Sequence, residues 1–257
     1  MVKLVKSPDN LEEKETLPKE LYIIIPAKNE EEALAIILPE IIPSYTKNVL
    51  VVDNGSSDRT ATISRKAGAK VIFEQRQGYG SACLAGIEYL SSLPKIPEYI
   101  CFFDGDGQSC VKDIIRVARP VIIGRTNYCQ GSRMKNKKSS LVLSSMARLA
   151  NRFFGIILST IWKQPISDLG PLRVITWNVL ANLNMESTGY GWTIEMSVKL
   201  MKLGLTHSEI PVQYKPRIMG KSKISGNVKT ALRAAFVMSL TLLSVMIFWR
   251  PTAGNKK

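Results

Sequence analysis

Four runs of consecutive apolar residues divide the first half of the chain, and a segment of helical composition follows each one. Continuous apolar runs of this length are typical of strands that are covered on both faces of a sheet. Helix-length segments between such strands predict right-handed βαβ units and a mostly parallel sheet. The expected strands are 21–26, 48–53, 69–74 and 99–104, and the expected helices are 30–38, 57–67, 79–90 and 111–118.

The second half of the chain has a less regular pattern. We expect a basic, mobile segment over 130–138, one long helix over 139–161 that carries Arg148 and Arg152, and a strand over 208–214. We find no internal repeat and no linker between two independent domains. We therefore predict a flexible N-terminal lead-in (1–18), one α/β domain (19–226) and a C-terminal apolar helix with its tail (227–257).

The apolar run over 234–249 contains no charged residue and lies between Arg233 and Arg250. A helix of this length extends about 24 Å, which is short of a ~30 Å hydrocarbon core. The basic ends and Trp249 favour a helix that lies in a membrane interface or is shallowly inserted. A helix that packs into the core and a true membrane span remain open alternatives.

The formal net charge of the chain is +14 and its pI is about 9.7, so its partners should be anionic. A nucleotide diphosphate, a nucleic acid and an acidic membrane surface all meet that condition. We expect no nucleic-acid partner, because the sequence shows neither a basic patch interleaved with aromatic residues nor a nucleic-acid-binding motif.

The rare residue types exclude several kinds of site. The single histidine, His207, argues against a histidine-based metal site and against a Ser–His–Asp triad. No GxxxxGK[ST] motif is present, which argues against a P-loop NTPase. The cysteines show no CxxC spacing, so we expect reduced, mostly buried thiols. They are Cys83, Cys101, Cys110 and Cys129.

The strongest chemical signal is the run CFFDGDGQ at the end of the fourth expected strand. Asp104 and Asp106 are separated by Gly105, so both carboxylates can turn towards one hard cation, and Gln108 can add a carbonyl oxygen. Oxygen ligands of this kind suit Mg²⁺ or Mn²⁺ bridging a diphosphate. An acidic surface turn is the alternative.

The other strand ends carry polar residues as well, and in parallel sheets the carboxyl ends of the strands meet at one edge. Asp53 follows the second strand and can accept hydrogen bonds from a base or a ribose, although a plain strand-to-helix turn would use the same residues. The QGYG segment around Gly78 lacks the third glycine of a dinucleotide fingerprint and is better interpreted as a loop that admits a nucleotide.

Taken together, the motifs IPAKNEE, VDNGSSDRT, FFDGDGQ, SDLGPLR, YGWTIEM and PVQYKPRIMGKSKISG resemble family 2 glycosyltransferases of the GT-A fold. The resemblance covers about residues 21–226, most of the chain. The last three motifs are similar to the branch with dolichyl- and polyprenyl-phosphate hexose synthases, such as dolichol-phosphate mannose synthase. The sequence departs from that branch in three places: Asp53-Asn54 where many relatives carry two acidic residues, SDLGPLR in place of an SGFR-type motif, and at most one C-terminal span.

The resemblance implies roles for individual residues. Asp104, Asp106 and Gln108 would hold the metal, and Asp106 would also be essential for catalysis. Lys221 and Lys223 would close over the donor as a mobile lid. The residues lining the nucleoside pocket would be Pro26, Lys28, Glu30 and Asp53, with Gly78 and Gly105 in the adjoining loops. Arg133 would face the diphosphate or the acceptor phosphate, and Asp168 and Arg173 would lie at the reaction centre.

The resemblance also implies an inverting transfer of a hexose from a UDP- or GDP-sugar to a polyprenyl or dolichyl phosphate, on the cytoplasmic face of a membrane. A lipid phosphate is already ionised near neutral pH and needs no strong base. A soluble or protein-linked hydroxyl acceptor, the alternative, requires a base, for which Asp168 and Glu195 are the candidates. A nucleotidyltransferase is disfavoured by the acidic PAKNEEE segment, and a nucleic-acid-binding protein is the non-enzymatic alternative.

Overall fold

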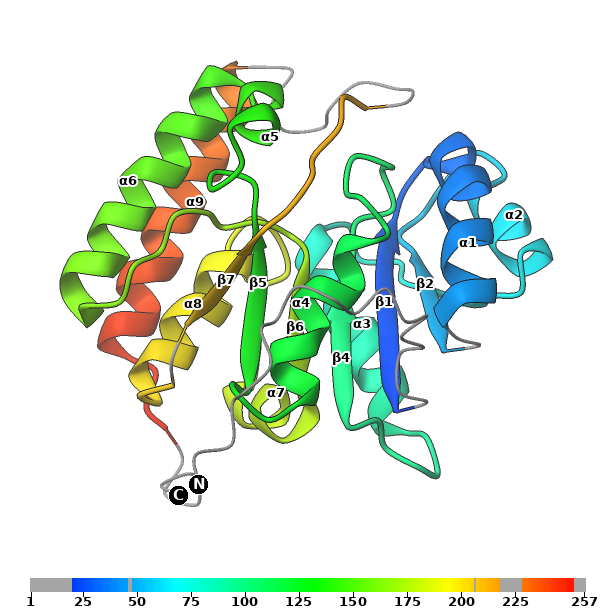
Figure 1. Cartoon of the computed structure of the whole chain (residues 1–257), viewed down its shortest axis with the longest axis horizontal. Helices are drawn as coiled ribbons and strands as arrows, with labels where there is room; N and C mark the ends of the chain where they lie inside the picture. Colours follow the sequence, from blue (N-terminus) through cyan, green and yellow to red (C-terminus); the bar gives the residue numbers. More distant parts are fainter. Residues whose placement is uncertain (1–19, 46–47, 206, 218–227, 252–257) are drawn as a thin grey trace, which may run out of the picture.

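The computed structural model describes residues 20–45, 48–205, 207–217 and 228–251. Within these ranges, seven strands form one sheet in the order β3-β2-β1-β4-β6-β5-β7, with helices on both faces (Figure 1). The α/β class and the mostly parallel sheet predicted from the sequence are confirmed.

The first four strands pair in parallel, as their apolar runs predict. β2 is buried along its whole length and β1 along most of it, because helices cover both faces. The strands are β1 (Leu21–Ala27), β2 (Val49–Asp53), β3 (Lys70–Phe73) and β4 (Tyr99–Phe102). The helices after them are α1 (Glu31–Tyr45), α2 (Thr60–Lys66), α3 (Tyr79–Ser91) and α4 (Asp113–Ile122). The carboxyl ends of these four strands therefore lie along one edge.

Three further strands complete the sheet, and two of them were missed by the sequence analysis. β5 (Tyr128–Ser132) and β6 (Arg173–Thr176) lie next to one another, and β7 (Ser208–Pro211) is the outer neighbour of β5. β6 is antiparallel to both β4 and β5. The expectation of a mobile segment at 130–138 was wrong at its start, because Gln130 is fully buried in β5.

The single long helix expected over 139–161 is two helices, α5 (Lys137–Val142) and α6 (Ser145–Trp162). Leu143 is extended between them, and the Ser144 side chain caps α6 by accepting a hydrogen bond from the backbone N–H of Ala147 at 3.1 Å. The Arg148 guanidinium donates to the carbonyl oxygen of Leu143 at 2.6 Å, so a basic side chain satisfies the backbone at the break.

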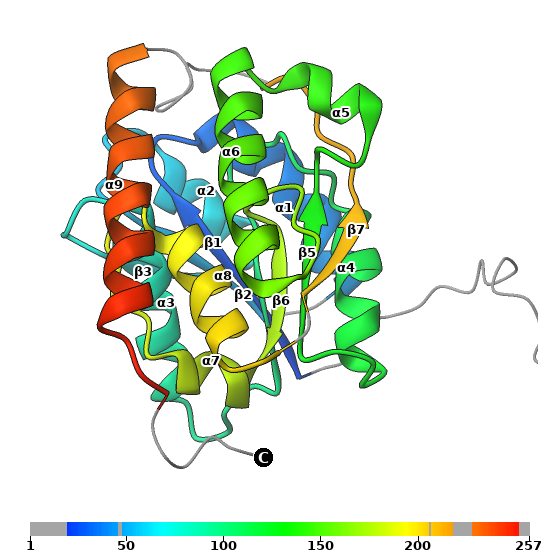
Figure 2. The same cartoon turned by 90° about the vertical axis from the view of Figure 1, so that its left-hand side faces the viewer.

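The helices form layers around the sheet (Figures 1 and 2). α1 and α4 build a core on one face, and α2 packs beside α1. α3, α7 (Trp177–Leu183) and α8 (Trp192–Lys202) build a core on the other face. α6 and α9 (Val228–Ile247) pack on α8 as an outer layer. The cysteines are free thiols, three of them buried, as expected.

α9 begins six residues earlier than the apolar run, at Val228, and has 20 residues. Among the helices of the described residues, it alone is long and apolar enough to cross a membrane, judged by length and composition. Its inner side is packed, since Ala234, Leu242 and Val245 are buried, while large apolar side chains on its outer side are exposed. The helix therefore combines core packing with an exposed apolar face.

Candidate functional site

The loops that follow β1 and β2 are joined to one another at the carboxyl edge of the sheet. Asn29 is in the left-handed region (φ 52°), and its side-chain oxygen accepts a hydrogen bond from the backbone N–H of Ser57 at 2.8 Å. The backbone N–H of Glu30 donates to the hydroxyl of Thr60 at 2.9 Å. Pro26 lies just before this junction, in β1. The predicted nucleoside-pocket residues of the first strand thus stand beside the second strand's loop.

Asp53 is buried at the end of β2, and the next residue, Asn54, joins this strand to the loop after β3. The Asn54 amide donates to two backbone carbonyls of that loop, and its oxygen accepts from the backbone N–H of Gly78 at 2.8 Å. Lys28 forms a hydrogen bond with the side-chain oxygen of Gln77. An asparagine here ties loops together, which explains one departure from the family pattern. The structure brings Lys28, Asp53 and Gly78 together at one rim.

The glycines of the QGYG segment have a packing role. A Cβ atom on Gly78 would lie 2.2 Å from the carbonyl oxygen of Thr188, and one on Gly80 would lie 2.0 Å from that of Ser187. The backbone N–H of Ser81 donates to the Thr188 carbonyl at 2.9 Å. These contacts hold the start of α3 against the segment before α8. Close backbone packing therefore accounts for the two glycines without a dinucleotide site.

Asp104 and Asp106 follow β4 directly. Asp104 Oδ1 is buried and has no hydrogen-bond partner among the described residues. Burial raises the pKa of Asp104 to about 7, with the nearby negative charge of Asp106 acting in the same direction. Gly105 keeps the turn close to β1, since a Cβ there would lie 3.1 Å from Ile25 Cγ2. The loop therefore presents an unpaired carboxylate oxygen that a cation would stabilise.

Gln108 braces the same loop against the segment that follows β7. Its side-chain oxygen accepts a hydrogen bond from the hydroxyl of Tyr214 at 2.9 Å, and its amide nitrogen donates to the Lys215 carbonyl at 3.1 Å. Both ends of the amide are engaged within the protein. The structure thus gives Gln108 a partner other than the metal proposed for it.

Arg217, a residue the sequence analysis did not single out, reaches into the carboxylate cluster. Its guanidinium lies 3.2 Å from both carboxylate oxygens of Glu30 and 3.1 Å from Asp106 Oδ2. The signal for it was the basic run KPRIMGKSKISG, in which only Lys221 and Lys223 were chosen. Those two lysines lie outside the described residues.

Arg133 and Asp168 form a bidentate ion pair next to this cluster. Arg133 Nε and Nη2 donate to the two Asp168 carboxylate oxygens at 2.9 and 2.8 Å, and the Arg133 backbone N–H donates to Oδ2 at 2.7 Å. The Asp168 side chain is fully buried. The Arg133 guanidinium also lies over the Tyr214 ring, 5.1 Å from its centroid. Asp168 is therefore committed to orienting Arg133.

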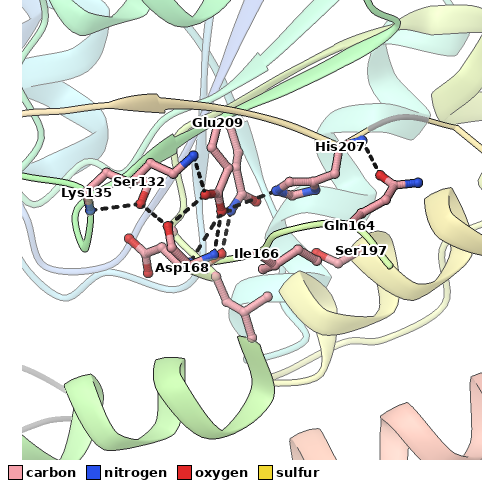
Figure 3. A network of polar contacts seen from close by, with 12 residues as sticks. Ser132, Lys135, Gln164, Ile166, Asp168, Ser197, His207 and Glu209 are labelled. Carbon is pink, nitrogen blue, oxygen red and sulfur yellow. Dashed lines mark hydrogen bonds and ion pairs between the residues drawn. The ribbon is translucent and has the colours of Figure 1, made fainter. Parts of the chain in front are cut away.

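A second network fixes the segment that carries Asp168 (Figure 3). Glu209 lies at its centre and accepts hydrogen bonds from the backbone N–H and the hydroxyl of Ser167 at 3.0 and 2.7 Å. Lys135 forms an ion pair with Glu209 at 3.1 Å, and His207 Nε2 lies 3.3 Å from it. Burial acts to raise the pKa of Glu209, but the hydrogen bonds from His207 and Ser167 outweigh it and lower the pKa to about 2.

Arg173 is buried at the start of β6, opposite Phe102 of β4. Its guanidinium donates to the carbonyl oxygens of Gly170 and Thr193 at 2.8 and 2.9 Å. Arg173 therefore connects the segment after Asp168 to α8 and does not line the cavity described below.

Glu195 is not grouped with the residues above. It is buried in α8, accepts hydrogen bonds from the backbone N–H groups of Glu186 and Ser187 at 2.9 and 2.8 Å, and pairs with Lys199 at 2.6 Å. Glu195 is therefore not a surface carboxylate. The contacts describe a side chain that holds a loop, since both carboxylate oxygens are engaged.

A cavity of about 260 Å³ joins the carboxylate cluster to the outer helices. Asp104 and Arg133 supply its charged lining, and Tyr79 lies beside them. The other walls come mainly from α6, α9, the start of α8 and the residues just before it, and most of these residues are apolar. They include Met146, Ala147, Ala150, Phe154, Tyr190, Trp192, Ala231, Ala234, Ala235 and Met238.

Comparison with known proteins places this arrangement in a family. The family model described as glycosyl transferase family 2 matches residues 22–171, more than half of the chain. The chain belongs to glycosyltransferase family 2. It is similar to an uncharacterized glycosyltransferase of Mycobacterium tuberculosis, with 30% identity over 228 residues that cover 89% of this chain and 95% of the relative.

A second relative has a more informative name. The UDP-N-acetylglucosamine–dolichyl-phosphate N-acetylglucosaminyltransferase of Methanococcus voltae is 26% identical over 216 residues, which cover 76% of this chain and 85% of that protein.

Among solved structures, glucosyl-3-phosphoglycerate synthase from Mycobacterium tuberculosis, in complex with Mn²⁺, UDP-glucose and phosphoglyceric acid, is similar with a TM-score of 0.68. The identity is 16%, over 87% of this chain and 78% of that one. This likeness confirms the GT-A fold expected from the sequence.

The residues of the family 2 site fit a divalent cation only in part. Within the described ranges, no three His, Cys, Asp or Glu side chains form a ready ligand set. Among the same residues, Asp104 does offer a buried carboxylate oxygen without a hydrogen-bond partner, and Asp106 lies two positions further along the chain. Two carboxylates suit Mg²⁺ or Mn²⁺ that takes its remaining ligands from a diphosphate and water.

Proposed function

We propose that this family 2 glycosyltransferase moves a hexose from a UDP- or GDP-sugar to a polyprenyl or dolichyl phosphate at a membrane surface, with inversion at the anomeric carbon. The observation that carries the proposal is the cavity between α6 and α9. Its walls are largely apolar and its charged residues are Asp104 and Arg133. A lipid phosphate matches this lining, because its anionic head suits Arg133 and its apolar chain suits the apolar walls.

The contacts that the two candidate bases already make also support a phosphate acceptor. A hydroxyl acceptor requires a group that removes its proton. Asp168 is held in its ion pair with Arg133, and Glu195 is engaged with backbone N–H groups and Lys199. A lipid monophosphate has a second pKa near ~6 and is largely ionised at neutral pH, so it needs no such base.

The chemistry then depends on placement and charge. The donor nucleotide lies along the rim formed by Lys28, Asp53 and Gly78, with Glu30 in the same loop as Lys28. An acceptor phosphate oxygen, held by Arg133, attacks the anomeric carbon from the cavity side. The bond to the nucleoside diphosphate breaks, and the diphosphate leaves with the bonding electron pair.

Asp104 and Asp106 are the residues that would hold Mg²⁺ or Mn²⁺, which would neutralise charge on the leaving diphosphate. Arg217 already pairs with Asp106, so a diphosphate bound at these carboxylates would also meet its positive charge. The relative from Methanococcus voltae, whose name states a UDP-sugar donor and a dolichyl phosphate acceptor, supports both halves of the proposal.

The test is a panel of radiolabelled UDP- and GDP-sugars, each with Mg²⁺ or Mn²⁺, presented with short-chain polyprenyl phosphate or with phosphoglyceric acid. We expect label in an organic-extractable product that mild acid releases. Label found only in a water-soluble product would contradict the lipid acceptor and favour a soluble one. Absence of donor hydrolysis and of donor binding across the panel would contradict the transferase itself.

A further inference from the structure

The outer faces of α6 and α9 carry rows of large exposed apolar side chains. On α6 these are Leu149, Phe153 and Ile156, and on α9 they recur every three or four residues. The α9 positions are Leu232, Phe236, Leu240, Leu243 and Ile247. This spacing places each row along one side of its helix. Figure 2 shows the two helices next to one another along one side of the molecule, so the rows belong to one surface.

The charge of this surface has a single sign. Neither helix contains an aspartate or a glutamate. Arg152, Lys229 and Arg233 are exposed on the same two helices, all in their first halves. Exposed apolar rows bordered by cations match an anionic lipid surface, where the apolar side chains enter the acyl boundary and the cations meet the headgroups.

The attachment of α9 to the rest of the protein argues against its crossing the membrane alone. The Lys202 side chain, at the end of α8, donates hydrogen bonds to the carbonyl oxygens of Val245, Met246 and Trp249 at 3.0, 2.8 and 2.6 Å. Leu242 is buried in the core that α9 shares with α6 and α8. A crossing orientation would break these contacts, whereas lying on a membrane keeps them.

We propose that α6 and α9 together form a membrane-resting surface, with both helices lying in the plane of an anionic lipid interface. The cavity is lined by the facing sides of the same helices, through Ala147 and Ala150 on one and Ala231 and Ala235 on the other. The inference deepens the proposed function by naming where the lipid acceptor is met. It stands on exposure and charge, however, and can be tested without donor or acceptor.

The experiment measures binding of the full chain to phosphatidylcholine vesicles with and without phosphatidylglycerol, by flotation. Two variants probe the two helices: Phe153→Ser on α6 (53% exposed) and Phe236→Ser on α9 (63% exposed). The matched control is Phe73→Ser, because Phe73 is 66% exposed but lies in β3 at the far edge of the sheet. Thermal unfolding checks that each variant keeps its fold.

We expect stronger binding to the anionic vesicles, and a roughly tenfold weaker partition for each helix variant but not for the control. If Phe236→Ser weakens vesicle binding and Phe153→Ser does not, the two-helix surface is overturned in favour of α9 acting by itself. No binding to either vesicle, with a dimer in solution that Phe153→Ser dissociates, would show that a second copy covers the surface. Transfer by the wild type to a short-chain acceptor in detergent does not depend on vesicle binding. It therefore tests the proposed transferase function separately from the membrane surface.

Discussion

At the scale of single residues, the site is defined by which charges are paired and which are not. Asp168 and Glu195 are buried and fully engaged, whereas Asp104 keeps one carboxylate oxygen that has no hydrogen-bond partner among the residues the structure describes. Arg217 bridges Glu30 and Asp106, so the protein places a positive charge beside the carboxylates before any ligand is considered. In the proposed mechanism, the chemistry therefore depends on the positions of these arginines and carboxylates more than on any candidate base.

Asp106→Ala tests the metal assignment. Transfer should fall by at least ~100-fold, because the charge on the leaving diphosphate would lose its stabilisation. The fold should survive, and thermal unfolding would verify this. Glu40→Ala, at an exposed position of α1, is the control and should keep its activity. Full wild-type activity in excess EDTA would refute the role of a metal.

The Arg133–Asp168 pair allows structure and function to be separated. Asp168→Ala leaves Arg133 largely buried without its partner and should cost about 3–5 kcal/mol in the free energy of unfolding. The double variant Arg133→Met with Asp168→Leu should recover most of that stability in urea unfolding. Transfer to the lipid acceptor should stay lost in the double variant, and its recovery would show that Arg133 does not hold the acceptor phosphate.

At the scale of elements, close backbone contacts and one buried network fix the positions of the loops. The first turn of α3 rests on the carbonyls of residues 187 and 188, and Glu209 of β7 holds residues 167 and 168. Both arrangements join elements that are distant in sequence. They determine how the rim of Lys28, Asp53 and Gly78 is placed relative to Arg133.

Gly80→Ala tests the first of these contacts. Alanine normally favours a helix over glycine by about 1 kcal/mol. Here its Cβ would lie 2.0 Å from the Ser187 carbonyl oxygen, so we expect a net loss of about 1–3 kcal/mol in chemical unfolding. Gly189→Ala is the matched control: a Cβ there meets nothing within 4 Å, and its effect should stay within about 0.5 kcal/mol. Equal stabilities for the two variants would contradict the contact.

Glu209 should make stability depend on pH. Its folded pKa of about 2 is below the ordinary value of 4.5, so its contribution is present above about pH 4.5 and is lost as the pH falls towards 2. The contribution is on the order of 3 kcal/mol. Denaturant unfolding of the wild type and of Glu209→Gln should differ by that amount near neutral pH, with the difference shrinking in acid. A constant difference across the range would show that the carboxylate charge is not responsible.

The parallel half of the sheet could be predicted because each of its strands is a continuous apolar run. β5 and β6 could not, since Gln130 and Arg173 are polar residues buried inside them. Gln130 donates to the carbonyl oxygen of Asp168 and Arg173 to that of Thr193, and both partners are distant in sequence, so no local pattern connects them to these strands.

The same limit applied to the site. Asp104 and Asp106 stood out by their spacing, and Arg133 and Asp168 by family resemblance. The pairing of Arg217 with Glu30, and the engagement of Gln108 by Tyr214, depend on contacts across more than a hundred positions. Long-range pairing of this kind is set by the fold and cannot be inferred from neighbouring residues.

At the scale of the whole molecule, the proposed function assigns different partners to opposite ends of the protein. The rim at β1 and β2 is polar and suits a nucleotide, while α6 and α9 lie at the opposite end of the molecule (Figure 1) and carry exposed apolar side chains. With a net charge of +14, the protein should be drawn to anionic surfaces at low ionic strength.

Salt should therefore affect transfer to a membrane-embedded acceptor more than transfer to a short-chain acceptor in detergent. Raising NaCl from about 0.05 M to about 0.5 M should lower transfer to acceptor in anionic vesicles several-fold, because screening weakens attraction to the membrane. Transfer to a short-chain acceptor in neutral detergent should change much less. Parallel rate measurements decide this, and equal losses for both acceptors would place the salt effect in the active site.

The order of the strands has a consequence for synthesis. β1 to β4 can pair with one another once residue 102 has left the ribosome, but β5 reaches its outer neighbour only through contacts such as Gln130–Glu209, 79 positions apart. At about 5–20 residues per second, this delay lasts several seconds. The nucleotide-binding half should therefore fold on the nascent chain, while the edge of β5 stays open to chaperones or to wrong partners until β7 arrives.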